Sequence, residues 1–390
     1  MKVERCAALL MVVAGCRVPE TASPPPSPGL PFSAESSAPR EAASWELVEL
    51  WQAKSSNDEL DFGGSVVSVG DIDRDGVRDV VVAAPPVRFD LGRVYVLSGD
   101  DGSVLDELRC MLVEPGRSQS VRHTTCNFGG ALCAIGDVDG DGVDDFAVGD
   151  AYLEPINRYP PFGVWIFSSA SRKILHSIVV DEPSGYGVQL AAPGDIDRDG
   201  APDLLVLAWG QISDCVDAIS GRTGERIYRT MLNEGTFTWL ARELAVVEDA
   251  NGDDVRDFIA WRSFRGLEPQ TRLWLFSGVD GAPLFELATW TPSSHAQAEA
   301  VARTCGDIDG DGIIDLLRPG LHGMRSTTEI VSGVDLRTLM TFEADSSHLE
   351  ALGDLDGDGS MEFSEWNHEF ADTVRVMSVR RAPKVAPSQH

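Results

Sequence analysis

Positive charge is scarce in this chain of 390 residues, which has 32 Lys and Arg against 62 Asp and Glu and a formal net charge of -30. Lysine is especially rare, with only Lys2, Lys54, Lys173 and Lys384. A protein that binds nucleic acid needs a basic surface for the phosphates, so we expect no nucleic-acid partner. The sequence also lacks a Gly-x-Ser-x-Gly elbow, a phosphate-binding loop and a dinucleotide fingerprint. These absences favour a protein that is not an enzyme.

Long apolar runs are absent as well. The longest, Cys6 to Gly15, has about ten residues, whereas a membrane-spanning helix needs about 20. With Lys2 and Arg5 before it, this run is typical of a secretory signal peptide. It ends in Val-Ala-Gly-Cys16, which resembles the lipobox of bacterial lipoproteins. That resemblance implies cleavage before Cys16, lipidation of Cys16, and a location in the cell envelope, at the outer membrane or cell surface. The alternative is an ordinary signal peptide with a chance cysteine.

Composition divides the rest of the chain. Residues 16–44 follow as a linker rich in Pro, Ser and Ala, which cannot bury enough apolar surface to fold. Residues 45–380 form the predicted folded domain, and residues 381–390 a flexible tail. Residues 1–15 are the predicted signal peptide.

An acidic nine-residue pattern recurs six times in the folded domain. Its first copy is Asp71-Ile-Asp73-Arg-Asp75-Gly76-Val-Arg-Asp79, and later copies start at intervals of 47 to 66 residues. Oxygens at positions one, three and five of a tight loop converge on one point, the carbonyl at position seven can join them, and Gly at position six permits the turn. Because these ligands are hard oxygens without His or Cys, they favour Ca²⁺. We therefore predict up to six structural calcium ions, and metal-coupled folding.

The predicted ligands include the acidic or amide side chains at positions one, three, five and nine. They are Asp71, Asp73, Asp75 and Asp79; Asp137, Asp139, Asp141 and Asp145; Asp195, Asp197, Asp199 and Asp203; Asp249, Asn251, Asp253 and Asp257; Asp307, Asp309, Asp311 and Asp315; and Asp354, Asp356, Asp358 and Glu362. The predicted carbonyl ligands belong to Val77, Val143, Ala201, Val255, Ile313 and Ser360. The first five copies have no carboxylate at position twelve, which distinguishes them from EF-hands. Copies four and six are the irregular ones, since Asp254 replaces Gly and Glu362 comes last.

Apolar strands flank each loop. In the first repeat Val66–Val69 precedes the loop, Val80–Ala84 follows it, and further strands are expected at Arg93–Leu97 and Val104–Leu108. Four short strands per repeat without helical periodicity predict an all-β fold, a β-propeller of four-stranded blades.

These features resemble a known repeat. Phe62-Gly63-Gly64, the Asp loop and Ala84-Pro85 are similar to the FG-GAP repeat of the integrin α-subunit head, a VCBS-like repeat. The resemblance implies propeller blades with Ca²⁺ between neighbouring strands. Phe-Gly becomes Tyr186-Gly187 in the third repeat and is lost at Leu240-Ala241 and Ala298-Glu299, which puts the packing of blades four to six in question.

Closure of the ring favours six blades over seven. Thr373–Val379 matches a third strand, and Trp45–Trp51 matches a fourth. Pairing them would complete the sixth blade and remove exposed sheet edges.

The remaining cysteines and aromatics have two interpretations each. Cys110 pairs with Cys126 or Cys133, or else Cys133, Cys215 and Cys305 are buried thiols. Trp165, Trp209, Trp261 and Trp274 are blade-packing residues rather than sugar platforms. The seven histidines, at positions 123, 176, 295, 322, 348, 368 and 390, contain no pair at metal-ligand spacing.

The function expected from these features is that of a surface-anchored adhesion or binding module for an extracellular protein or glycan. The first alternative is a hydrolase or lyase of polysaccharide, which would need carboxylates outside the loops at one mouth of the channel. The second is a structural component of the envelope.

Overall fold

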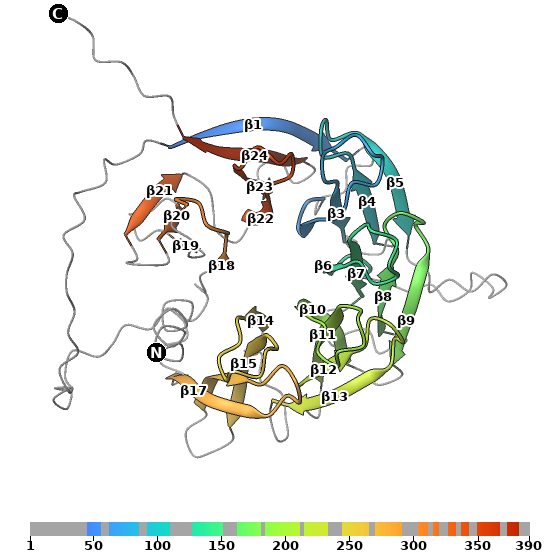
Figure 1. Cartoon of the computed structure of the whole chain (residues 1–390), viewed down its shortest axis with the longest axis vertical. Coiled ribbons are helices and arrows are strands. Elements are labelled where there is room, and N and C mark those ends of the chain that lie inside the picture. The colour runs from blue at the N-terminus through green and yellow to red at the C-terminus, as the bar shows by residue number, and fades with distance from the viewer. Residues whose placement is uncertain are drawn as a thin grey trace, which may run out of the picture.

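The structure is a computed structural model, and it describes residues 45–55, 62–85, 92–109, 127–150, 162–180, 184–210, 214–232, 244–264, 270–290, 303–310, 315–319, 327–332, 337–342, 349–366 and 373–381. These residues form six four-stranded antiparallel sheets, arranged as a ring of six propeller blades (Figure 1). The predicted fold class and blade number are confirmed. Among the described residues no helix is long and apolar enough to cross a membrane.

Each of the first five blades uses consecutive strands. Blade one comprises β2 (Val66–Ser68), β3 (Val80–Ala84), β4 (Arg93–Leu97) and β5 (Val104–Arg109); blade two β6 (Ala131–Gly136), β7 (Asp145–Gly149), β8 (Phe162–Phe167) and β9 (Ile174–Val180); blade three β10 (Ser184–Gly194), β11 (Asp203–Gly210), β12 (Cys215–Ile219) and β13 (Arg226–Met231). Blade four comprises β14 (Leu244–Val247), β15 (Asp257–Phe264), β16 (Gln270–Phe276) and β17 (Pro283–Trp290); blade five β18 (Arg303–Thr304), β19 (Leu316–Pro319), β20 (Thr328–Val331) and β21 (Thr338–Phe342).

The sixth blade is shared between the two ends of the chain. It contains β22 (Leu349–Gly353), β23 (Met361–Trp366) and β24 (Thr373–Arg381), and β1 (Trp45–Lys54) pairs antiparallel with β24 as its outermost strand. The register runs from Trp45 opposite Arg381 to Lys54 opposite Thr373, with an irregularity between Glu49 and Trp51. The predicted closure is therefore confirmed, and β24 ends one residue beyond the expected boundary at 380.

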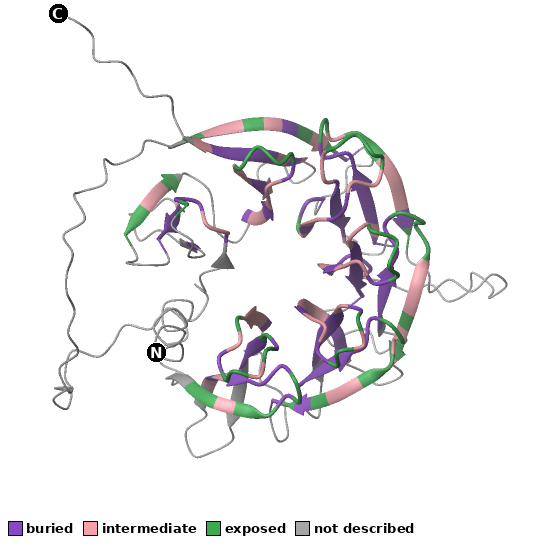
Figure 2. Ribbon diagram, viewed as in Figure 1, coloured by how far each residue is buried: buried purple, intermediate pink, exposed green. Residues whose placement is uncertain are grey.

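The hydrophobic core lies between the faces of neighbouring blades. The middle strands β3, β7 and β12 are buried along their whole length, whereas the outer strands β5 and β9 at the rim consist mostly of intermediate and exposed residues (Figure 2). One cluster joins Val81 and Val96 of blade one to Phe146 and Trp165 of blade two. Since both faces of a blade are covered by neighbours, its middle strands are continuous apolar runs.

Buried thiols contribute to these interfaces. Cys133, Cys215 and Cys305 are free and buried, and each belongs to a core cluster. The interpretation of these three as buried thiols is confirmed, and pairing of Cys133 with Cys110 is not seen. Cys110 and Cys126 lie outside the described residues.

Two of the four tryptophans have described side chains that pack as predicted. Trp165 is 2% exposed and contacts the ring of Phe128 edge to face, with centroids 5.7 Å apart. Trp274 packs against the core between blades three and four. The side chains of Trp209 and Trp261 lie outside the described set.

Candidate metal centres

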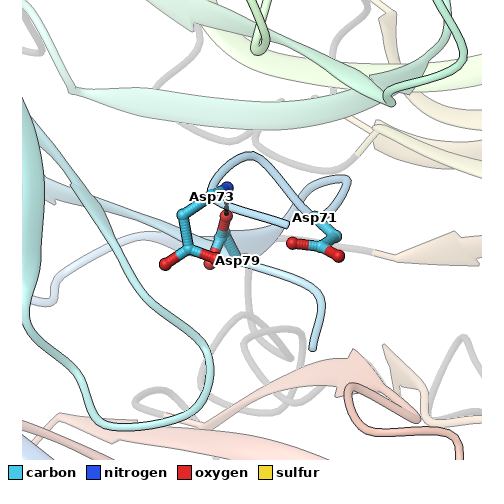
Figure 3. Close-up of side chains that lie close together, drawn as sticks. All are labelled: Asp71, Asp73 and Asp79. Atoms are coloured by element: carbon cyan, nitrogen blue, oxygen red, sulfur yellow. Dashed lines mark hydrogen bonds between the residues drawn. The ribbon is translucent and has the colours of Figure 1, made fainter. Parts of the chain in front are cut away.

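Each Asp loop joins the first strand of a blade to the second, and its carboxylates organise its backbone. In loop one, Asp71 Oδ1 accepts the N–H groups of Arg74 and Asp75 at 2.7 and 3.1 Å. Asp71 Oδ2 accepts Gly76 N–H at 3.0 Å. Asp75 Oδ1 in turn accepts Val77 N–H at 2.8 Å. The aspartates thus fold the chain into a tight turn with the acidic side chains close together (Figure 3).

The aspartate at position nine fastens the loop to the rest of its blade. Asp79 is fully buried; its Oδ2 accepts Ile72 N–H at 2.6 Å, and its Oδ1 accepts Gly99 N–H at 3.1 Å from the turn between β4 and β5. Burial raises the pKa of Asp79 to about 6, against these hydrogen bonds, and the neighbouring charge of Asp73 raises it further. Position nine therefore holds the loop, and an added cation beside it would favour its charged form.

The same arrangement recurs around the ring. Position-nine carboxylates accept the N–H of position two at 2.9 Å in loop two, 2.6 Å in loop three, 2.9 Å in loop four, 2.8 Å in loop five and 2.8 Å in loop six. The fastening to the turn between the third and fourth strands repeats at Asp145 with Ser169, Asp203 with Gly221, and Asp257 with Gly278. Burial likewise raises the pKa of Asp145 and of Asp203 to about 6.

Five of the six loops bring three carboxylates together, with one oxygen from each lying within 4.8 Å of the others. The sets are Asp71, Asp73 and Asp79; Asp137, Asp139 and Asp145; Asp195, Asp197 and Asp199; Asp307, Asp309 and Asp315; and Asp354, Asp356 and Glu362. Loop four forms no such set among its described residues, since Asn251 replaces one carboxylate. The structure therefore groups positions one and three in five loops, with position nine in four of them and position five in loop three.

The other predicted ligands lie nearby in the same loops. Of the described position-five aspartates, Asp199 alone belongs to a close set. All five of them, at positions 75, 141, 199, 253 and 358, accept the N–H of position seven. Val255 and Ala201 at position seven bury their side chains in the blade. Asp311 and Ile313 lie outside the described residues.

A second left-handed residue in each loop was missed from the sequence. Position four has positive φ in all six copies, with Arg74 at 67° and Arg198 at 62° where the other four have Gly. Position six is left-handed as predicted in the five loops where it is described, and Asp254 adopts this conformation with φ 66°. The signal was present in the sequence, because Gly occurs at position four in four of the copies.

The donor set and one buried atom fit a hard cation. In loop six, Glu362 is fully buried, and its Oε1 has no hydrogen-bond partner while Oε2 accepts Leu355 N–H. A buried carboxylate oxygen without a partner is costly unless a cation supplies the charge. Clustered carboxylate and carbonyl oxygens suit Ca²⁺ better than Zn²⁺ or copper.

Other chemistry-bearing groups do not gather in the described part of the molecule. The described innermost strands carry one carboxylate, Glu350 of β22. His176 of β9 packs over Gly224 in the next blade, and the remaining histidines lie outside the described ranges.

The comparisons with known proteins agree with this geometry. Residues 63–97 match the FG-GAP repeat family. Integrin alpha-PS2 of Drosophila melanogaster is 31% identical over 187 residues, covering 42% of this chain and 12% of the integrin. Integrin alpha-IIb of Homo sapiens is 33% identical over 161 residues, covering 38% of this chain and 15% of the integrin. The similarity thus spans a small part of these relatives' length.

Solved structures show more distant likeness. The exotype rhamnogalacturonan lyase YesX aligns with a TM-score of 0.46 and 13% identity over 80% of this chain and 72% of its own. A chain from the complex of BBS1N with ARL6DN aligns with a TM-score of 0.49 and 9% identity, covering 85% of this chain and 98% of that one.

Proposed function

We propose that this chain, a six-bladed propeller with an FG-GAP repeat and partial similarity to integrin α-subunits, is a calcium-stabilised binding module of the bacterial cell surface. Its partner would be an extracellular protein or a glycan, and its role adhesion rather than catalysis. The observation that carries the proposal is the recurrence of the carboxylate sets, in the same position of five blades, within a fold similar in sequence to integrin α-subunits.

Calcium is the first element of the proposal. The ligands would be the carboxylates at positions one, three, five and nine, together with the carbonyl at position seven. Bound Ca²⁺ would supply positive charge where four acidic side chains otherwise repel one another. Binding to the folded state alone stabilises that state.

Metal content and thermal unfolding of the purified chain test this element. We expect several bound calcium ions, and a lower unfolding temperature after chelation that recovers when calcium but not sodium is added back. An unchanged melt and no bound metal would contradict it.

Binding of an extracellular partner is the second element. Beads coated with the chain should bind saturably to at least one member of a panel of purified extracellular proteins and polysaccharides, and chelation should release them. Beads coated with the heat-unfolded chain are the control. Binding to none of the panel would favour the structural-envelope alternative, and breakdown of a polysaccharide would favour the hydrolase or lyase.

The described inner strands supply no pair of carboxylates for such an enzyme, since Glu350 stands alone on them. We therefore propose no enzymatic activity.

The lipid anchor on Cys16 is the third element. Detergent-phase partitioning of the chain expressed in bacteria should place it with membrane proteins, and Cys16→Ser should move it to the aqueous phase. The same distribution for both forms would contradict lipidation while leaving the binding module untouched.

A further inference from the structure

Loop five holds an arginine against one of its predicted metal ligands. Arg337, immediately before β21, places Nη2 2.8 Å from Asp309 Oδ2. Asp309 is buried, whereas the described residues at position three of the other five loops are exposed. The guanidinium therefore covers this carboxylate and supplies a positive charge to it.

Arginines from two other elements also place a positive charge beside carboxylates of loops three and six. Arg222, in the turn between β12 and β13, has Nε 3.4 Å from Asp199 Oδ1, and its Nη2 donates to the Asp199 carbonyl at 2.6 Å. Arg380 of β24 has Nη2 3.2 Å from Asp358 Oδ2 and 4.0 Å from Asp356 Oδ2. All four carboxylates are predicted ligands at position three or five.

The other three loops are different. Among their described residues, the carboxylates at positions one, three and five of loops one, two and four form no ion pair with arginine. Two arginines contact these loops at other atoms. Arg78 pairs with Asp144 at position eight of loop two, which is not a predicted ligand, and Arg198 donates to the backbone carbonyl of Asp253 in loop four rather than to its carboxylate. The distinction therefore follows from individual contacts rather than from the number of nearby arginines.

We propose that the six loops form two classes, in which loops three, five and six carry a resident arginine that takes part of the role of the calcium ion. This inference rests on the proposed calcium binding. An arginine beside the ligands lowers the net negative charge of the site by one, and it must move or remain as a like charge near an incoming Ca²⁺. Loop affinity for calcium depends on the number of ligand charges. Loops one and two should bind more tightly, and loops three, five and six on the order of tenfold more weakly. Loop four, in which Asn251 leaves one carboxylate fewer, belongs with the weaker loops.

The arginines also predict a different response to chelation. In the arginine-containing loops a positive charge remains after calcium is removed, so their carboxylates repel each other less. Loops one and two, with four carboxylates and no such arginine, should open first when the metal is withdrawn.

A calcium titration of the metal-free full chain tests the affinity classes. Isothermal calorimetry or native mass spectrometry should show the ions of two loops binding before the rest. The triple variant Arg222→Gln, Arg337→Gln and Arg380→Gln should raise the calcium affinity of loops three, five and six about tenfold, towards that of the tighter sites. The matched control is Arg109→Gln, which removes an exposed arginine that pairs with Glu107 outside the loops. Six equal sites in the wild type, or a triple variant that titrates like the control, would overturn the proposal.

Hydrogen exchange of the wild-type chain gives a second test that needs no variant. After chelation, peptides covering residues 71–79 and 137–145 should gain more exchange than those covering 195–203 and 354–362. Equal gains in all four would overturn the proposal even if calcium binds. By contrast, absence of calcium from every loop in the titration would overturn the proposed function itself.

Discussion

One tryptophan connects the last blade to the first. Trp51 belongs to β1, the outer strand of blade six, but its Nε1–H donates to the Gly99 carbonyl of blade one at 2.7 Å. Its ring packs over Gly102, where an added Cβ would lie 2.5 Å from Trp51 Cε3. Trp51 is 7% exposed, in a core cluster with residues of both blades.

These contacts predict how much free energy of unfolding two substitutions of Trp51 should cost. Trp51→Phe keeps most of the buried area but leaves the buried Gly99 carbonyl without its donor, at a cost of about 2 kcal/mol. Trp51→Ala also loses the ring and leaves a cavity, and should cost about 4 kcal/mol. Urea unfolding in saturating calcium, followed by circular dichroism, measures both.

A double-mutant cycle separates the contribution of the contact between Trp51 and Gly102 from general destabilisation of the protein. Gly102 has φ 73°, so Gly102→Ala carries a left-handed backbone penalty as well as the collision with the indole. In the Trp51→Ala background the collision disappears, and Gly102→Ala should cost less by at least about 0.5 kcal/mol. Gly140→Ala is the control, since Gly140 has φ 78° and open space around it. If the losses of unfolding free energy for Gly102→Ala and Trp51→Ala are strictly additive, and Trp51→Phe leaves stability unchanged, the role of this contact in closing the ring is refuted.

Three further predictions test other parts of the structure. Asp254→Gly should stabilise loop four by about 1 kcal/mol, because Asp254 is left-handed at φ 66°; Asp254→Asn, which removes the charge but keeps Cβ, should not, and equal melts for both variants would contradict the backbone argument. Burial raises the pKa of Asp150 from 3.8 to about 8, so the folded state keeps a proton that the unfolded chain loses, and this group makes stability fall by about 1.4 kcal/mol per unit as pH rises from 4 to 8. Asp150→Asn should flatten that slope and raise the unfolding temperature at pH 8, whereas profiles parallel to wild type between pH 5 and 8 would count against it. Tyr186→Phe should cost about 1 kcal/mol by removing the hydroxyl that donates to buried Asp217, while Asp217→Ala should cost about 4 kcal/mol because it leaves the Arg229 guanidinium without its bidentate partner; urea midpoints in the reverse order would be inconsistent with this network.

The acidic loops and the closure were predictable because each rests on a local pattern. Nine consecutive residues define a loop, and the regular order of strands around it leaves β1 and β24 as the two parts of one blade. Position four was also within reach, but the predicted turn assigned the left-handed conformation to position six alone. Arg74 and Arg198 conceal the second one in the copies where Gly is absent.

The replacement of an aromatic residue by an ionisable one in three blades could not be recognised without the register between strands. In each blade, one residue of the third strand pairs with the second-strand residue that lies three positions after the last loop ligand. These third-strand residues are Tyr95, Trp165, Asp217, Trp274, Glu329 and Arg375. It is aromatic in blades one, two and four and ionisable in three, five and six. In blade three, Tyr186 replaces Phe and its hydroxyl reaches Asp217, which explains why the Phe-Gly signature changes there. The spacing between second and third strands varies from blade to blade, so the sequence alone does not align this position.

The arginines that distinguish the loops are also a tertiary feature. Arg222 and Arg337 precede the fourth strands of their blades, whereas Arg380 lies near the end of β24. They share no position in the repeat, so no periodicity connects them. Only the fold brings each to a carboxylate of a loop that is 22 to 28 residues away.

One chain of hydrogen bonds connects a loop to the neighbouring blade. Asp79 Oδ1 accepts Gly99 N–H, and the carbonyl of Gly99 accepts Trp51 Nε1–H from blade six. The same connection recurs in blade four, where Asp257 accepts Gly278 N–H and the Gly278 carbonyl accepts the Tyr228 hydroxyl from blade three at 2.7 Å. Because one glycine makes both contacts, a position-nine carboxylate that holds the glycine N–H also helps to position the carbonyl that accepts from the neighbouring blade. Metal in a loop would then stabilise the interface between blades as well as its own turn. In a closed ring without exposed sheet edges, that interface is the place where the ring opens most easily.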